Sequence, residues 1–373
     1  MARWACVLHL SLTVALVPPI ARPPSRVVGS GAAYDYCIQS LGCTAAEAAK
    51  AERALLPNIA ENITRAQAEE KCSWLRSRLD LSDAELKKVV LWSPTFLSKS
   101  VEDTLAPKLE WLQTRLDLDA AELRKVVMGR PSQLSYSVED NMAPRLEWLQ
   151  TRLDLDDLGL RKMVLTFPSL LGYSVEDNME PKLNWLETRL DLDAGQLRKI
   201  VVRSPAVLGS SVEDNMAPTL EWLQRRLELD DAELRKLVLG LPPLLGLRIE
   251  ENMAPKLEWL QMRLGLDAAE LRKMILTFPA LLSLSVEDNM EPKLGFFEEE
   301  LALSASEVRA SIVSTPSRLG SSLTKRYKPR LKVCRAAGAD VSIVLRWAGQ
   351  TDAAFCKRVG VPLEALRAAQ ENV

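Results

Sequence analysis

The chain has 373 residues, and 47% of them are apolar, which is enough for a folded core and excludes a chain that is disordered throughout. Its formal net charge of −2 gives no overall attraction to nucleic acid or to anionic lipid. The single histidine, His9, and six cysteines without CxxC spacing argue against histidine-based catalysis, a zinc site and a disulfide framework.

The first 34 residues differ from the rest of the chain. They contain three arginines, no acidic residue and an apolar run, and that run is about a dozen residues long, the length of a signal h-region. We predict that residues 1–34 are a targeting sequence, removed or disordered in the mature protein. A secretory signal, a mitochondrial presequence, a signal followed by a plastid-type address and a plain disordered terminus all fit. The run is too short to span a bilayer as a helix, so we expect no integral membrane segment in the mature chain.

A period of 37 residues then governs the chain. Two proline series and one aromatic series follow it without interruption. The first series is Pro57, Pro94, Pro131, Pro168, Pro205, Pro242, Pro279 and Pro316, and the second is Pro107, Pro144, Pro181, Pro218, Pro255, Pro292 and Pro329. The aromatic series is Trp74, Trp111, Trp148, Trp185, Trp222, Trp259 and Phe296. Repeats of this length are typical of solenoids or propellers. We predict a repeat array over residues 35–331, with about eight copies of which the first is degenerate, and a C-terminal helical cap over residues 332–373.

The copy at residues 137–173 shows what each repeat contains. Its first half has apolar residues at helical spacing, namely Met142, Leu146, Leu149 and Leu153. Its second half follows the same rule with Leu160, Met163, Val164 and Phe167. No segment alternates with period two, so each copy is two helices and a short connector. The fold predicted is an all-α solenoid, right- or left-handed, with the tryptophans in the core between copies.

Capping residues and prolines mark the predicted helix boundaries. The second helix of a copy opens on Ser, Thr or Asp, with Glu or Gln three residues later, as in Asp119 and Glu122. Asp156 is the exception, because Gly159 occupies the partner position. The first helix opens on a serine before Val-Glu-Asp. Prolines of the Pro168 series should end the second helix, and those of the Pro144 series should kink the first helix or split off a short opening turn.

Together these motifs resemble the repeat of the mitochondrial transcription termination factor (mTERF) family. The pattern is P-x-L/V-L, a serine, P-x-L-x-W/F-L and R-L-x-L-x-x-x-E-L-R-K-V, and the run SLTKRYKPRLKVCRAAGADVSIVLRWAGQTDAAFCKRV at 322–359 is similar to the way the family closes. The resemblance spans roughly residues 37–359. It implies a helical superhelix whose groove receives double-stranded DNA or RNA, a role in organellar transcription, transcript processing or ribosome assembly, and neither enzyme activity nor a cofactor. The copies between 74 and 300 are more alike than is usual in the family.

The array itself is acidic. Residues 71–304 contain 30 Lys and Arg against 39 Asp and Glu, whereas residues 305–373 contain 12 against 5. Each second helix nevertheless carries an adjacent basic pair, and stacked copies would align these pairs along one edge. The candidate nucleic-acid-binding pairs are Lys87 and Lys88, Arg124 and Lys125, Arg161 and Lys162, Arg198 and Lys199, Arg235 and Lys236, and Arg272 and Lys273. The alternative is a solvated face of ion pairs along the helices.

A second basic site follows at the end of the array. Five cations within eight residues surround Tyr327, which suits phosphate contacts and base stacking. The candidate residues are Lys325, Arg326, Lys328 and Arg330, with Lys332 beside them. The alternative is a positively charged C-terminal cap on the array.

These observations predict a monomeric organellar protein, in a mitochondrion or plastid, that binds double-stranded DNA or RNA and regulates gene expression. The alternative is a protein-binding helical-repeat scaffold, which the acidity and the uniform copies favour. A catalytic function is not expected, because the chain has no Gly-rich phosphate loop after a strand and no metal-ligand spacing, and its carboxylates lie at helix starts. We expect no cofactor and no metal.

Overall fold

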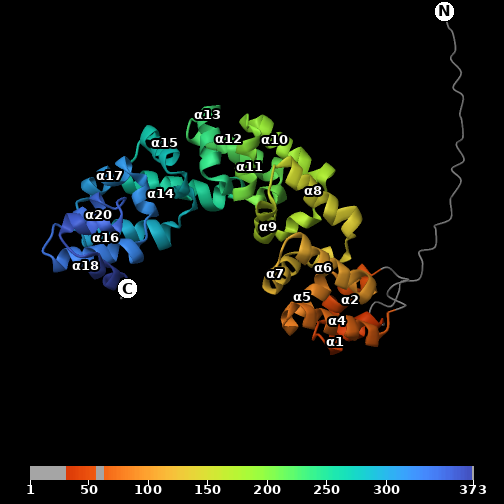
Figure 1. Cartoon of the computed structure of the whole chain (residues 1–373). Helices are drawn as coiled ribbons and strands as arrows, with labels where there is room; N and C mark the ends of the chain where they lie inside the picture. Colours follow the sequence, from red (N-terminus) through yellow and green to blue (C-terminus); the bar gives the residue numbers. More distant parts are fainter. Residues whose placement is uncertain (1–30, 56–62, 372–373) are drawn as a thin grey trace, which may run out of the picture. The chain divides into compact units, whose positions relative to one another are not determined.

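The computed structural model describes residues 31–55 and 63–371, and these residues form helices and no strand. They divide into two compact units, Met1–Lys99 and Ser100–Val373, whose helices are coloured in chain order in Figure 1. The predicted targeting sequence lies outside the described residues, apart from residues 31–34 at the start of the first helix, and Pro57 lies outside them too. No helix in the described part is both long and apolar enough to cross a membrane.

The first unit contains four described α-helices and a short 3₁₀ helix. They are α1 (Ala32–Gln39), α2 (Ala45–Ala54), α4 (Arg65–Leu79), α5 (Asp83–Trp92) and η1 (Pro94–Ser98). Helix α1 packs against α2 and α4, and α2 packs against α5. Capping boxes open α2 at Thr44, α4 at Thr64 and α5 at Ser82, so the free N–H groups of each first turn are satisfied locally.

The second unit repeats one pair of α-helices. The first helices of the pairs are α6 (Ala106–Arg115), α8 (Ala143–Arg152), α10 (Glu180–Leu190), α12 (Ala217–Arg226), α14 (Ala254–Leu264), α16 (Glu291–Glu299) and α18 (Lys328–Ala336). The second helices are α7 (Ala120–Gly129), α9 (Asp157–Thr166), α11 (Ala194–Arg203), α13 (Asp231–Gly240), α15 (Ala268–Thr277) and α17 (Ala305–Ser314). Three further helices follow, namely α19 (Ile343–Arg346), α20 (Asp352–Val359) and α21 (Leu363–Glu371). The predicted all-α solenoid of 37-residue repeats is confirmed.

The predicted boundaries of the second helices are confirmed by their caps. In α7 the Asp119 side chain accepts a hydrogen bond from the Glu122 N–H at 2.8 Å, and the Glu122 carboxylate accepts one from the Asp119 N–H at 3.0 Å. At α9 only half of this box forms, since Asp156 accepts from the Gly159 N–H and no side chain returns the bond. The residue before the cap region often adopts positive φ, as at Asp154 and Asp191, and this reversal joins the two helices of a copy.

The connector between copies is more regular than the sequence indicated. Prolines of the Pro168 series end each second helix, as predicted, and each then opens a 3₁₀ helix. In the second unit these are η3 (Pro131–Ser135), η5 (Pro168–Gly172), η7 (Pro205–Gly209), η9 (Pro242–Gly246), η11 (Pro279–Ser283) and η13 (Pro316–Gly320). Successive 3₁₀ helices contact one another, as η5 does with η7 and η11 with η13, so the connectors contribute to the stacking of copies.

The second proline of each copy is accommodated by a π-helical turn. The Ser137 side chain accepts from the Asp140 N–H, and the Met142 N–H then donates to the Ser137 carbonyl, five residues back. This wider turn places Pro144, which lacks an N–H, in the first turn of α8. The predicted short opening turn is therefore confirmed. The turns of this kind are η2 (Val101–Leu105), η4 (Val138–Met142), η6 (Val175–Met179), η8 (Val212–Met216), η10 (Ile249–Met253), η12 (Val286–Met290) and η14 (Leu323–Tyr327).

The core lies between the two helices of a copy and the neighbouring copies. Met142, Leu146 and Leu149 on the first helix are fully buried, as are Leu160 and Val164 on the second. The tryptophans depart from the prediction. Each of the six is only half-buried, whereas Phe296 at the same position is buried. The tryptophan row therefore lies at the edge of the core, where each side chain is partly exposed to solvent.

Cations inside the array bind successive copies together. Lys108 and Lys256 are buried, and their ammonium groups donate to the carbonyls of Leu134 and Leu282 at 2.6 Å, in the 3₁₀ helix of the next copy. Lys293 makes the same contact with the Leu319 carbonyl and also donates to Asn289 Oδ1 at 2.6 Å. Burial lowers the pKa of Lys293 to about 8. These cations have a structural role and are not available to an external ligand.

Candidate nucleic-acid interface

The first cation of a predicted basic pair forms an ion pair with a carboxylate of the preceding copy, in every pair for which such a contact is described. Arg161 on α9 donates to the Glu122 carboxylate at 2.6 Å, Arg272 on α15 pairs with Glu233, and Arg309 on α17 extends the pattern with Glu270 at 2.6 Å. The acceptor in all three cases is the carboxylate that also completes the cap of the preceding second helix. The hydrogen bond to Glu122 raises the pKa of Arg161.

Two arginines use a different carboxylate because the cap residue of the preceding copy cannot accept them. Gly159 has no side chain at the cap position, so Arg198 donates to the Asp154 carboxylate at 2.8 Å and to the Asp154 carbonyl at 2.9 Å. Gln196 carries no charge there, and Arg235 pairs with Asp191 at 2.7 Å. Both alternative acceptors are the positive-φ residues that connect the helices of a copy. The surrounding carboxylates neutralise these arginines and hold them in place.

The second residue of each pair behaves differently. Lys125, Lys162, Lys199, Lys236 and Lys273 are exposed at one position of successive second helices, and none has a side-chain partner within the described residues. Helix α7 packs against α9, α11 against α13 and α13 against α15, so neighbouring helices carry these lysines in register. The structure thus separates the pairs at 161/162, 198/199, 235/236 and 272/273 into a fixed arginine and a free lysine, which the sequence did not distinguish.

Among the second helices, cations are most concentrated on α11. It carries Arg198, Lys199 and Arg203 and no acidic residue, because Gly195 and Gln196 occupy its first turn. Arg203 is exposed and has no partner in the described part of the chain. Arg203 was not among the predicted residues, although its sequence position is distinctive: an arginine stands where the equivalent positions of neighbouring copies have glycine or threonine.

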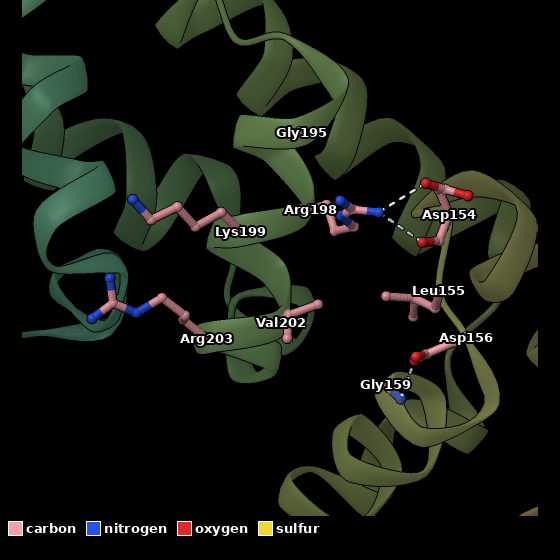
Figure 2. Close-up of a pocket in the computed structure, with 9 residues that line it drawn as sticks. All are labelled: Asp154, Leu155, Asp156, Gly159, Gly195, Arg198, Lys199, Val202 and Arg203. Atoms are coloured by element: carbon pink, nitrogen blue, oxygen red, sulfur yellow. Dashed lines mark hydrogen bonds and ion pairs between the residues drawn. The ribbon is translucent and has the colours of Figure 1, made fainter.

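Open hollows flank α11 on both sides. One, of about 770 Å³, lies between α9 and α11, where Val202 and Leu155 face one another and Arg198 reaches toward Asp154 (Figure 2). Lys199 and Arg203 line this hollow too, and Figure 2 shows their side chains extending from the side of α11 that faces away from Asp154. On that side a second hollow of about 440 Å³ is lined by Lys199, Arg203, Arg235 and Lys236. The structure therefore brings the cations of two successive copies to one groove.

The remaining predicted residues of these pairs lie toward the start of the chain. Lys87 and Lys88 belong to the first unit, where the Lys87 ammonium pairs with Glu47 at 3.1 Å and Lys88 is exposed. Arg124 is half-buried on α7, beside the exposed Lys125. At Lys87 and Lys88, too, the first cation is ion-paired and the second is exposed.

The predicted C-terminal site requires a correction at Arg330. This side chain is fully buried, and its guanidinium donates to the carbonyls of Trp347 at 2.8 Å and Gln350 at 2.7 Å and to the Asp352 carboxylate at 2.7 Å. Burial would raise the pKa of Asp352, but the hydrogen bonds from Arg330 and Gln370 outweigh it and lower that pKa. Arg330 holds the C-terminal segment and cannot reach an external phosphate.

Tyr327 and Arg326 are also used inside the fold. Tyr327 is buried against Phe297, with ring centroids 5.0 Å apart, and its hydroxyl donates to the Arg318 carbonyl at 2.7 Å, so base stacking is excluded in this structure. Arg326 is half-buried and donates to the Ala348 carbonyl at 2.6 Å. Two of these partners lie far along the chain, since Phe297 precedes Tyr327 by 30 residues and Ala348 follows Arg326 by 22 residues, so the sequence did not show these contacts.

Three cations of the C-terminal cluster remain exposed, namely Lys325, Lys328 and Lys332. Lys328 and Lys332 line a hollow of about 310 Å³ between α16 and α18. They belong to a first helix, whereas the free lysines described above belong to second helices. The two predicted basic sites are therefore separate surfaces on different helices.

Comparison with known families gives one result. The sequence model of the mTERF family matches the chain over residues 49–193 and 186–355. The search of curated proteins gave no match.

Proposed function

The chain belongs to the mTERF family of nucleic-acid-binding helical-repeat proteins, and we propose that it binds double-stranded DNA or RNA through the free cations of its second helices. The central element of the proposed interface is the α11 groove, which we define by Lys199, Arg203 and Lys236. The exposed lysines of the neighbouring second helices extend this surface on either side.

The observation behind this proposal is that the first cation of a basic pair is ion-paired and the second is exposed. Carboxylates of the preceding copy neutralise the first cation, so the array can be acidic overall and still present the second cation at a regular interval. Phosphate groups also recur at a regular interval along a duplex, and cations that neutralise them release counterions. A regular row of lysines without internal partners suits that ligand.

The direct test is a mobility-shift titration of the full chain with duplex DNA and with duplex RNA over a salt series. We expect binding at low salt that weakens steeply as salt rises. Replacing Lys199, Arg203 and Lys236 by alanine should weaken binding by roughly tenfold to hundredfold at low salt. The same variant should reduce the salt slope by about 0.9 for each phosphate that is no longer neutralised.

The matched control is Arg225→Ala. Arg225 is an exposed arginine on the first helix α12, outside the α11 groove, so its loss should leave both affinity and salt slope nearly unchanged. Equal losses in the control and the triple variant would overturn the assignment to the α11 groove. Absence of binding to either duplex at low salt would overturn the proposed function itself.

We further propose a role in organellar gene expression, in a mitochondrion or plastid, and a non-catalytic, monomeric mode of action. Family membership supports the organelle and the nucleic-acid ligand. Fusing residues 1–34 to a fluorescent protein and locating it in cells tests their proposed role as the targeting sequence. Crosslinking in the isolated organelle, followed by sequencing of recovered nucleic acid, separates a role on DNA in transcription termination from a role on RNA.

A further inference from the structure

A hollow on the first-helix side of the array has the opposite character to the α11 groove. It lies between α14 and α16, has a volume of about 650 Å³ and is lined by Trp259, Phe296, Gly295 and the carboxylate residues Glu287, Glu291 and Glu299. We call these residues the acidic–aromatic groove. It contains no lysine or arginine among its lining residues, so its wall is apolar and its rim is negative.

The carboxylates of this groove are only partly neutralised. Arg263 donates from Nε to the Glu291 carboxylate at 3.1 Å and also pairs with Glu298 at 2.8 Å. Glu287 and Glu299 are exposed, and neither forms an ion pair within the described residues. Two negative charges therefore remain available in the hollow that the partly exposed Trp259 also lines.

Two substitutions distinguish this groove and its surroundings from the same place in other copies. Met262 is 77% exposed and lies one turn after Trp259 on α14, at a position where α6, α8, α10 and α12 have threonine or arginine. Gly295 replaces the glutamate or asparagine found in the other copies between α6 and α14, and an added Cβ would meet nothing within 4 Å. The groove is thus opened at Gly295, carries two carboxylates without an ion pair, and has the exposed apolar side chain of Met262 one turn from Trp259.

We propose that the acidic–aromatic groove binds a basic segment of a protein partner, with arginine or lysine side chains inserted beside Trp259. Carboxylates attract such side chains, and a cation over an indole face gains a further favourable interaction. The methylene stem of arginine or lysine would cover Met262 and Trp259, which otherwise expose apolar surface to water. The space left by Gly295 provides room for the inserted side chain.

Charge complementarity determines the class of partner. Phosphates would be repelled by Glu287 and Glu299, so a nucleic acid does not fit this groove. The next first helix, α18, exposes Lys328 and Lys332, which would repel a basic segment. The segment should therefore lie across α14 and α16 and end before α18.

The test is fluorescence anisotropy of the full chain with a short labelled peptide of alternating arginine and alanine, compared with a matched glutamate–alanine peptide. We expect the arginine peptide to bind and the glutamate peptide to show no binding. The double substitution Glu287→Gln and Glu299→Gln should weaken arginine-peptide binding by about tenfold, since it removes both available charges. Gly295→Asn, which gives the residue found at Asn184, should weaken it by filling the hollow without changing its charge.

Glu364→Gln is the control, because Glu364 is exposed on α21 and lies outside the groove. This variant should bind the arginine peptide as the wild type does. Equal binding of both peptides, or equal affinity of the wild type and the double variant, would overturn the proposal. Met262→Thr, the residue of three other copies, adds a variant whose fold is secure, and an unchanged affinity there would exclude the apolar contribution. These results do not depend on nucleic-acid binding, so either proposal can fail alone.

Discussion

Two neighbouring copies of the array have the same backbone and opposite surfaces. The segment 285–300, which forms η12 and α16, contains six acidic residues and one basic residue, whereas the segment 322–337, which forms η14 and α18, contains six basic residues and no acidic one. Both open on a serine whose side chain caps a π-helical turn, and both place a proline in the first turn of the α-helix. Reversal of nearly every exposed charge leaves this local structure intact.

Apart from the capping serine and the proline, what the two copies share lies at buried positions. Met290 and Tyr327 are buried at one position, Leu294 and Leu331 at another, and the cations Lys293 and Arg330 at a third. Both cations donate to backbone carbonyls further along the chain. Caps and buried residues therefore specify the repeat, and the exposed positions are left to determine what each copy binds.

The largest effect should follow from removing the buried cation of the basic copy. Arg330→Met would leave the carbonyls of Trp347 and Gln350 and the Asp352 carboxylate without their donor. We expect a loss of roughly 2–4 kcal/mol in the free energy of unfolding, measured by urea denaturation. We also expect α19 to α21 to become sensitive to limited proteolysis, since we propose that residues 332–373 cap the array. Lys328→Met, two residues away on α18 and exposed, should change the stability by less than about 0.5 kcal/mol.

The equivalent cation of the acidic copy should give a smaller effect that depends on pH. Burial lowers the pKa of Lys293 to about 8, from 10.5 for an exposed lysine, so the unfolded chain binds more protons between these values. The stability contributed by this group is therefore lowest below pH 8 and rises as the pH is raised toward 10.5. The stability of the wild type relative to Lys293→Met should rise over this window by about 1–3 kcal/mol. If the stability difference between the wild type and Lys293→Met does not change with pH, as we expect for Lys328→Met, the pKa of Lys293 is not lowered by burial.

The exposed positions of the basic copy should affect binding and leave folding unchanged. Replacing Lys325, Lys328 and Lys332 by glutamine removes three exposed cations that have no partner in the described part of the chain. If this surface extends the nucleic-acid interface, the affinity for duplex DNA at low salt should fall about tenfold. The control is the double variant Glu287→Gln and Glu299→Gln in the acidic copy, which should not weaken duplex binding. Unchanged duplex affinity in the lysine variant would restrict the interface to the second helices.

The sequence was sufficient to predict the repeat, its helices and its caps, because each of these depends on residues close together in the chain. It could not separate Arg198 from Lys199 or predict that Arg330 is buried, because their partners lie 44 and about 20 residues away. Whether a cation is paired or exposed depends on which side chain of the neighbouring copy lies beside it. Arg203 shows the converse, since a comparison of aligned copies would have identified it without a structure.

The smallest effect should come from the ion pairs that join second helices. Glu233→Gln would give α13 the residue that α11 carries at Gln196, where the arginine of the next copy turns to the positive-φ residue instead. Arg272 should then turn to Glu228, which has a φ of 51° at that position. Because the pair is replaced and lies at the surface, the stability should change by less than about 0.5 kcal/mol. A double-mutant cycle with Arg272→Ala measures the coupling. A coupling energy well above 1 kcal/mol would show that these ion pairs hold the array together. A small coupling energy would mean that they serve to neutralise the first cation of each basic pair.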